Sequence, residues 1–307
     1  MSLNVVPHHM SYLLGDIGGT NLRLCIYKNE EVTKTQVFST TKYPKIEVAI
    51  KEFQGSENVT KCCLAIAGPV INHGDHETVI LTNQDHKLEY NSKELSKMVG
   101  YPCKFINDFA AIGYYLTKER LAEAYHVLHK PAQELKGERT SVYLGAGTGL
   151  GFGYLYKTTV FSSEGGHIRF APESPFELEF FDFCKRQTKS LKHMSVERAV
   201  SGPGIKCLYD FVVGTNKLVM DVINADPEME KNLKPLFKAN ELKQRFVPLT
   251  DVSPDADISA IVSKKALAGD PQCLALMALF FAWYGRYTAD AAVTFCPKTI
   301  YLTGGII

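Results

Sequence analysis

An acid followed by a glycine-rich turn is the first group of residues in the chain that could do chemistry. In the run LLGDIGGTNLRLCIY (13–27), an apolar segment ends at Asp16. After the turn, the alternation of Leu22, Leu24 and Ile26 predicts a returning strand. Glycine lets the backbone approach a ligand closely, and the N–H groups of such a turn can hold an anion. The combination indicates metal–nucleotide chemistry, and an ordinary glycine hairpin is the alternative.

The same arrangement recurs twice. SVYLGAGTGLGFGYLY (141–156) is again an apolar strand, a glycine-rich turn and a returning strand, and TIYLTGGII (299–307) repeats the first strand and the paired glycines. Three such turns predict phosphate and nucleoside contacts from two related half-domains. The turns are followed by strands, so they are not Rossmann fingerprints, and the sequence has no G-x-x-x-x-G-K-[ST] motif.

A second acid lies at the end of another predicted strand. Residues 104–106 are expected to form a strand that carries Asn107 and Asp108 at its carboxyl end, followed by a helix from Phe109 to about residue 128. Open α/β sheets bind ligands where a strand gives way to a helix. The helix dipole also favours an ionised Asp108, which could then accept a proton. An Asn-Asp helix cap is the structural alternative.

Further polar candidates follow the second glycine turn. In FSSEGGHIRFAP (161–172), Glu164 and His167 flank two glycines, and side chains around such a turn can converge on sugar hydroxyls. Glu197 begins ERAVSGPG (197–204), whose turn precedes a predicted helix. A metal-ligand or general-base role for His167 has no neighbouring ligand spacing to support it.

Composition limits the class of protein. A chain of 307 residues corresponds to about two domains, and its 45% hydrophobic and 22% charged content is that of a globular protein. A net charge of +1 gives no electrostatic case for nucleic acid or an anionic membrane as a partner. The eight cysteines include no C-x-x-C pair, which indicates buried, reduced thiols in a cytosolic protein.

Two other segments have simpler explanations. The histidines at positions 73, 76 and 86 lack the helical H-x-x-x-H spacing of a zinc site, so we expect them in surface loops. Residues 271–295 are largely apolar, but Gly285, Arg286 and Asp290 interrupt them, which favours a buried helix over a membrane span. Residues 214–257 are polar and contain several prolines, and we expect a partly helical surface insertion.

Taken in order along the chain, the motifs closely resemble those of the bacterial-type glucokinase family, of the actin, Hsp70 and hexokinase ATPase superfamily. They are GDIGGTN (15–21), INDF (106–109), GAGTGLG (145–151), EGGH (164–167), ERAVSGPG (197–204) and TGG (303–305). The resemblance implies an α/β, two-domain actin-like ATPase fold of the ribonuclease H-like type, with an interdomain cleft. We expect a small domain over residues 1–109 and a large domain over residues 110–307.

The resemblance also implies an activity: ATP-dependent phosphorylation of glucose at the 6-hydroxyl, giving glucose 6-phosphate and ADP in cytoplasmic glycolysis. It assigns Asp108 as the base, with sugar contacts from Asn107, Asp108, Glu164, His167 and Glu197. It assigns Mg²⁺ to Asp16, through water. The expected ATP contacts are Asp16, Gly18, Gly19, Thr20, Asn21, Gly147, Thr148, Gly149, Gly304 and Gly305.

The chain departs from the family pattern at two places. Thr82 and Asn83 occupy the position of a Thr-Asn pair near the sugar, but residues 84–86 differ from the usual aromatic-containing pattern. The family also continues beyond its TGG strand with further helices, so we expect the complete protein to contain them. A homodimer is common among these relatives, and the sequence leaves the oligomeric state open.

Three alternatives remain to be distinguished. A catalytically idle sugar sensor on the same fold usually carries an added DNA-binding segment or lacks the base, whereas this sequence retains Asp108. A hexokinase of broader sugar range would share all the motifs. An actin- or Hsp70-like ATPase would lack the INDF and EGGH motifs and would hydrolyse ATP without sugar.

Overall fold

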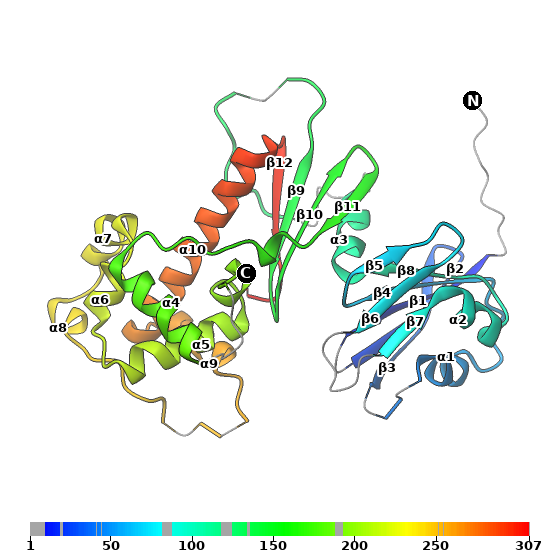
Figure 1. The fold of residues 1–307 in the computed structure, drawn as a ribbon, viewed down its shortest axis with the longest axis horizontal. Coiled ribbons are helices and arrows are strands. Elements are labelled where there is room, and N and C mark those ends of the chain that lie inside the picture. Colours follow the sequence, from blue (N-terminus) through cyan, green and yellow to red (C-terminus); the bar gives the residue numbers. More distant parts are fainter. Residues whose placement is uncertain are drawn as a thin grey trace. The chain divides into compact units, whose positions relative to one another are not determined.

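The chain forms two compact units, Met1–Val127 and Leu128–Ile307, which are described separately (Figure 1). In this division the helix that begins at Asp108 groups with the first unit, and the domain boundary expected after residue 109 stays a prediction. The computed structural model describes residues 10–18, 21–40, 42–43, 45–81, 88–117, 125–133, 136–187, 193–250, 252–253 and 255–306.

The first unit is built on a mixed five-stranded sheet of order β3-β2-β1-β4-β8. Strands β1, β2 and β3 form an antiparallel meander, and β1, β4 and β8 run parallel. The predicted alternation in β2 is confirmed, because Leu22, Leu24 and Ile26 are all buried. The strands are β1 (Ser11–Ile17), β2 (Asn21–Lys28), β3 (Glu31–Ser39), β4 (Lys61–Ile66) and β8 (Cys103–Asn107).

A small antiparallel sheet and helices complete this unit. The sheet has the order β5-β6-β7, with β5 (Val70–Asn72), β6 (Glu77–Leu81) and β7 (Leu88–Asn91). The helices are α1 (Ile46–Gln54), α2 (Ser92–Val99) and α3 (Asp108–Leu116). Helix α1 buries one stripe at helical spacing, formed by Ile46, Ala49, Ile50 and Phe53.

Helix α3 is shorter than predicted. The apolar spacing suggested a helix to about residue 128, but α3 ends at Leu116, and residues 125–130 are not helical. The hydroxyl of Thr117 donates to the carbonyl of Tyr114 at 2.8 Å, so a side chain satisfies one of the last carbonyl groups of the helix. Residues 118–124 lie outside the described residues.

The second unit repeats the strand arrangement of the first. Its sheet has the order β11-β10-β9-β12, in which β9, β10 and β11 are antiparallel and β12 runs parallel to β9. The strands are β9 (Ser141–Ala146), β10 (Leu150–Tyr156), β11 (Thr159–Ser163) and β12 (Thr299–Thr303). In both units a glycine turn therefore joins the two central antiparallel strands, as the recurrence of the motif predicted.

Helices pack on this sheet around a second hydrophobic core. They are α4 (Pro175–Gln187), α5 (Gly202–Gly214), α6 (Val219–Ile223), α7 (Pro227–Asn232), α8 (Ala239–Leu242), α9 (Ile258–Leu267) and α10 (Pro271–Phe295). The 3-10 helices are η2 (Gly165–His167), η3 (Val196–Arg198) and η4 (Lys234–Leu236). The predicted partly helical insertion corresponds to α6–α8 with η4.

The long apolar helix α10 is buried in this core, as predicted. Phe280, Trp283 and Tyr284 are each almost fully buried. Arg286, which interrupts the apolar pattern, pairs with Glu173 at 2.7 Å and with the fully buried Glu177. Within the described residues, no single helix has both the length and the hydropathy to span a membrane, and only the sharply bent pair α9–α10 satisfies those criteria jointly.

Candidate active site

The first glycine turn joins β1 to β2 and places an ion pair beside it. Gly18 N donates to Asn21 O at 2.9 Å, which closes the hairpin, while Gly19 and Thr20 lie outside the described residues. Asp16 and Arg23 are partners in the β1–β2 register, and Arg23 Nη1 donates to Asp16 Oδ2 at 2.8 Å. Arg23 was not predicted as a site residue, although the register of the predicted hairpin places it opposite Asp16.

Asp16 and Asp108, the two candidate acids of the first unit, lie at the same edge of its sheet. In the parallel register, Asp16 is level with Ala65 on β4, and Ala65 is level with Ile106 on β8. Asn107 and Asp108 follow Ile106 directly, so both acids lie at the carboxyl ends of these strands. Two strand spacings separate β1 from β8, about 10 Å.

Asn107 is the N-cap of α3. The helix cap, which was the alternative to a functional role, is therefore observed for this residue. Its Oδ1 accepts hydrogen bonds from Phe109 N and Ala110 N at 3.0 and 3.1 Å, and its Nδ2 donates to Gly68 O at 2.9 Å. Asp108 is the exposed first residue of the helix, and its Oδ1 accepts from Phe109 N at 2.8 Å. A carboxylate at a helix N-terminus is stabilised in its ionised form, which can accept a proton.

In the second unit, backbone bonds bring two distant motifs together. Val196 N donates to Ile168 O and Phe170 N donates to Met194 O, both at 2.9 Å. These bonds align the segment after EGGH with the segment before ERAV. The alignment brings His167 Nδ1 to 3.8 Å from Glu197 Oε1. Within the EGGH turn itself, His167 Nε2 lies 3.5 Å from a Glu164 carboxylate oxygen.

The Glu197 carboxylate connects this cluster to the second glycine turn. Its Oε2 accepts a hydrogen bond from Leu150 N at 2.9 Å, and its Oε1 is the atom nearest His167. A Cβ atom at position 149 would lie only 2.7 Å from Oε2, so the carboxylate occupies the space that Gly149 leaves. The absence of a side chain at position 149 therefore allows the Glu197 carboxylate to lie against the turn.

The second glycine turn is held by two further segments. Gly202 N, at the start of α5, donates to Gly147 O at 2.8 Å. Gly304 has φ +113°, and a Cβ there would lie 2.1 Å from Ala146 O, so both its conformation and its packing require glycine. A cavity of about 260 Å³ adjoins the turn and is lined by Thr148, Cys184, Gln187, Glu197, Arg198, Ser201, Pro203 and Cys207.

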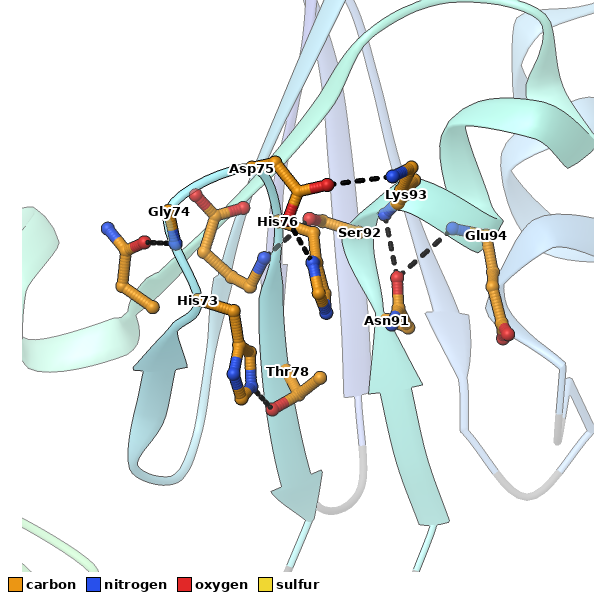
Figure 2. Close-up of polar contacts among 11 residues, drawn as sticks. His73, Gly74, Asp75, His76, Thr78, Asn91, Ser92, Lys93 and Glu94 are labelled. Carbon is orange, nitrogen blue, oxygen red and sulfur yellow. Dashed lines mark hydrogen bonds and ion pairs between the residues drawn. The ribbon is translucent and has the colours of Figure 1, made fainter.

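Two of the histidines that were weighed as metal ligands, His73 and His76, lie in the connection between β5 and β6 (Figure 2). His73 contacts Thr78 Oγ1 at 2.9 Å, and His76 contacts Asp75 at 2.7 Å. Hydrogen bonds from Lys93 and then His76 hold the pKa of Asp75 below its ordinary value. Among the described residues, no group of three or more His, Cys, Asp or Glu side chains is arranged to hold a metal. His86 and the Thr82-Asn83 pair lie outside those residues.

The predicted site residues therefore form two groups. Asp16, Asn107 and Asp108 share the carboxyl edge of the first sheet, and Glu164, His167 and Glu197 form a polar cluster beside the second glycine turn. The first group offers an ionised acid and an oxygen ligand, and the second offers donors and acceptors suited to hydroxyl groups. Arg198 and Ser201, which line the cavity next to Glu197, were not predicted.

Comparison with known proteins identifies the family. A family model described as Glucokinase matches residues 13–307. The chain is 29% identical to a glucokinase from Escherichia fergusonii, over 96% of this chain and 81% of that protein. It is 31% identical to a glucokinase from Synechocystis, over 97% of this chain and 84% of that protein.

Solved structures share the fold. A glucokinase from an Antarctic psychrotroph aligns with a TM-score of 0.64 at 24% identity, over 96% of this chain and 83% of that one. A glucokinase from Balamuthia mandrillaris, in complex with glucose, aligns with a TM-score of 0.68 at 20% identity, over 96% of this chain and 79% of that one. The expected sugar-kinase fold of the actin-like ATPase class is thus confirmed, and the chain belongs to the glucokinase family.

Proposed function

We propose that this protein transfers the γ-phosphoryl group of ATP to the 6-hydroxyl of glucose. The match of the family model over residues 13–307 carries this proposal. The position of Asp108 at the carboxyl edge of the parallel strands and at the start of α3 supports the proposal that this acid is the base. A related structure, a ROK family glucokinase from Streptomyces griseus, contains glucose and the ATP analogue AMPPNP.

In the proposed reaction, Asp108 accepts the proton of the sugar's 6-hydroxyl. The hydroxyl oxygen forms a bond to the γ-phosphorus while the bond from that phosphorus to the β,γ-bridging oxygen breaks, and ADP leaves. Asp108 is the first residue of α3, and its carboxylate is exposed. Asn107 fixes the start of the helix through its cap bonds, and so it positions Asp108.

Glu164, His167 and Glu197, together with Asn107, are proposed to bind the other hydroxyls of glucose. Carboxylates accept hydrogen bonds, and the histidine ring can donate one and accept another. Both Glu164 and His167 are more than half exposed, so their polar atoms are accessible to a ligand. Bonds from several elements to one sugar would fix the orientation of the 6-hydroxyl.

The nucleotide is proposed to lie against the glycine turns, with phosphate contacts from Gly18–Asn21 and Gly147–Gly149 and nucleoside contacts from Gly304 and Gly305. Asp16 is half exposed and offers carboxylate oxygens, the ligands that Mg²⁺ prefers, while Arg23 occupies one of them. This arrangement fits a magnesium ion held through water. When bound, Mg²⁺ would offset phosphate charge and orient the phosphoryl group. We propose that the product, glucose 6-phosphate, enters glycolysis. The free cysteines agree with a reducing compartment such as the cytoplasm.

The first test is Mg-ATP-dependent ADP release with a panel of hexoses, on the native protein and on Asp108→Asn. We expect glucose-stimulated turnover that falls by about 10²–10⁴-fold in the variant, because the amide cannot accept the proton. Calorimetry should show that the variant still binds glucose. Asp182→Asn, an exposed acid on α4, is the matched control and should keep its activity.

Two outcomes would contradict the proposal. Turnover that is independent of both sugar and Asp108 would indicate a general ATPase. Glucose binding without turnover in the native protein would indicate a sugar sensor. Equal turnover with glucose, mannose and fructose would keep the kinase and widen the substrate to hexoses in general.

A further inference from the structure

A pair of cysteines lies in the wall of the cavity that adjoins the second glycine turn. Cys184 is on α4 and Cys207 is on α5, two helices that pack together in the second unit (Figure 1). Their Sγ atoms are 3.0 Å apart, so the two thiols face one another. Both residues line the cavity of about 260 Å³ that Thr148 and Glu197 also line.

We propose that Cys184 and Cys207 form a reversible oxidative modification site that reacts with hydroperoxides or small-molecule disulfides. A disulfide has an S–S length of about 2.05 Å, so the sulfurs need to approach by only about 1 Å from their present separation. In cytosolic proteins a disulfide of this kind is usually transient and redox-sensing. The cavity provides the route by which a small oxidant reaches the pair.

The two thiols are not equivalent, and this sets the order of the reaction. Cys184 is 5% exposed, whereas Cys207 is partly exposed. The hydrogen bond with Cys184 lowers the pKa of the Cys207 thiol, with further help from Lys206 and Arg198, while burial and Asp210 oppose this effect. The same hydrogen bond and burial raise the pKa of Cys184. Cys207 is therefore the attacking thiolate and Cys184 the resolving thiol.

The chemistry balances with a peroxide as oxidant. The Cys207 thiolate attacks one peroxide oxygen, the O–O bond breaks, and hydroxide leaves, which gives a sulfenic acid at Cys207. The Cys184 sulfur then attacks the Cys207 sulfur and displaces the hydroxyl group as water. In sum, two thiols and one hydrogen peroxide give one disulfide and two water molecules. Oxidised glutathione gives the same disulfide by two exchange steps that release two molecules of glutathione.

The position of the two cysteines also predicts that ligand binding affects the rate of disulfide formation. This prediction rests on the proposed function. Thr148 and Glu197 are proposed to contact phosphate and sugar, and they share the cavity with both cysteines. Glucose and Mg-ATP bound there would restrict access of the oxidant to Cys207. We therefore expect saturating ligands to slow disulfide formation at least threefold.

The test is differential thiol labelling with peptide mass spectrometry on the native protein, after stepwise addition of hydrogen peroxide. We expect a 184–207 linked peptide that dithiothreitol removes, and that is absent from Cys184→Ser and Cys207→Ser. Phenylarsine oxide, a dithiol reagent, should bind the native protein but neither variant at this site. Cys62 and Cys103, which are partners across β4 and β8, are the internal comparison and should oxidise more slowly.

Several results would overturn the inference. If Cys184 and Cys207 stay reduced at peroxide concentrations that oxidise the exposed Cys296, the pair is not an oxidation site. A disulfide at Cys62–Cys103 that forms first would contradict the role of the cavity. If the 184–207 disulfide forms but bound glucose and Mg-ATP do not slow it, the coupling to ligands is wrong. Calorimetry of ligand binding separates that result from a failure of the proposed function.

Discussion

At the scale of single residues, Glu197 serves two neighbouring groups at once. Its Oε2 accepts from Leu150 N in the second glycine turn, and its Oε1 is the oxygen nearest His167. The same carboxylate is therefore placed between the proposed sugar contacts and the proposed phosphate turn. A change at this residue should affect both substrates, whereas a change at a residue that contacts only the sugar should affect one.

We expect Glu197→Ala to raise KM for both glucose and ATP, by about 10-fold or more, because a charged hydrogen bond is worth about 1.5–3 kcal/mol. The variant also leaves Leu150 N without its carboxylate partner, which should loosen the turn. Steady-state kinetics with each substrate varied in turn measures both effects. Glu164→Ala is the matched control, and it should raise KM for glucose alone. An unchanged KM for ATP in Glu197→Ala would contradict the shared role.

The sequence could single out candidate reactive residues, but it did not show most of the atoms that they contact. Asp16, Asp108 and the glycines were recognised from their positions at the ends of apolar strands. The contact of Arg23 with Asp16 follows from the register of one predicted hairpin and could have been found in this way. The contact of Glu197 with Leu150 N depends on packing between distant segments, which the sequence does not show. A linear pattern shows that two residues are polar, but it does not show which atoms they face.

At the scale of elements, two glycines of the second unit differ in what their side-chain-free position allows. Gly153 on β10 lies opposite Tyr143 on β9, and a Cβ at this position would lie 2.2 Å from the tyrosine ring. Tyr143 is fully buried, so its ring has no space into which it can move. Gly285 lies within α10, where a Cβ would meet no atom within 4 Å. Packing therefore requires glycine at position 153 but not at position 285.

We expect Gly153→Ala to lower the free energy of unfolding of the second unit by about 1–3 kcal/mol through overpacking. Gly285→Ala, the control, should raise it by about 0.5–1 kcal/mol, because alanine favours a helix more than glycine does. Chemical denaturation of both variants and of the native protein measures the two changes. A stable Gly153→Ala would show that the Tyr143 ring can shift, contrary to its burial.

Elements were predictable where the pattern was strong, and less so at their ends. The alternation of Leu22, Leu24 and Ile26 correctly predicted β2, and the interrupted apolar run correctly predicted the buried helix α10. The predicted end of α3 was wrong: the helix ends at Leu116, and residues 125–130 are not helical, although the apolar spacing continues to about residue 128. Apolar spacing marks which face of a helix can be buried, but it does not mark where the helix ends.

At the scale of the whole molecule, two units with separate hydrophobic cores repeat one strand arrangement. The recurrence of glycine turns in the sequence predicted this duplication. The boundary after residue 109 stays a prediction for the functional domains, while the compact units meet at residues 127 and 128. The sequence could not place this boundary, because it depends on which unit α3 packs against.

The single tryptophan allows the two cores to be followed separately. Trp283 is 2% exposed in the core of the second unit, and the chain contains no other tryptophan. Its fluorescence therefore reports on the second unit, whereas far-UV circular dichroism reports on both. We expect the two signals to give different midpoints in urea, with circular dichroism changing first, because the first unit has the smaller core. Coincident curves would show that the chain unfolds as one cooperative unit.

The ion pair between Asp16 and Arg23 has an electrostatic consequence for an incoming nucleotide. The two side chains together carry no net charge, and both are at least half exposed. A triphosphate that approaches this hairpin therefore encounters a neutral Asp16–Arg23 ion pair instead of an isolated carboxylate. The Coulomb repulsion between the acid and the phosphates, about 1 kcal/mol per charge pair at 4 Å in bulk water, is largely cancelled before any metal ion arrives. Arg23 thus makes the hairpin tolerant of polyanions in the absence of a divalent cation.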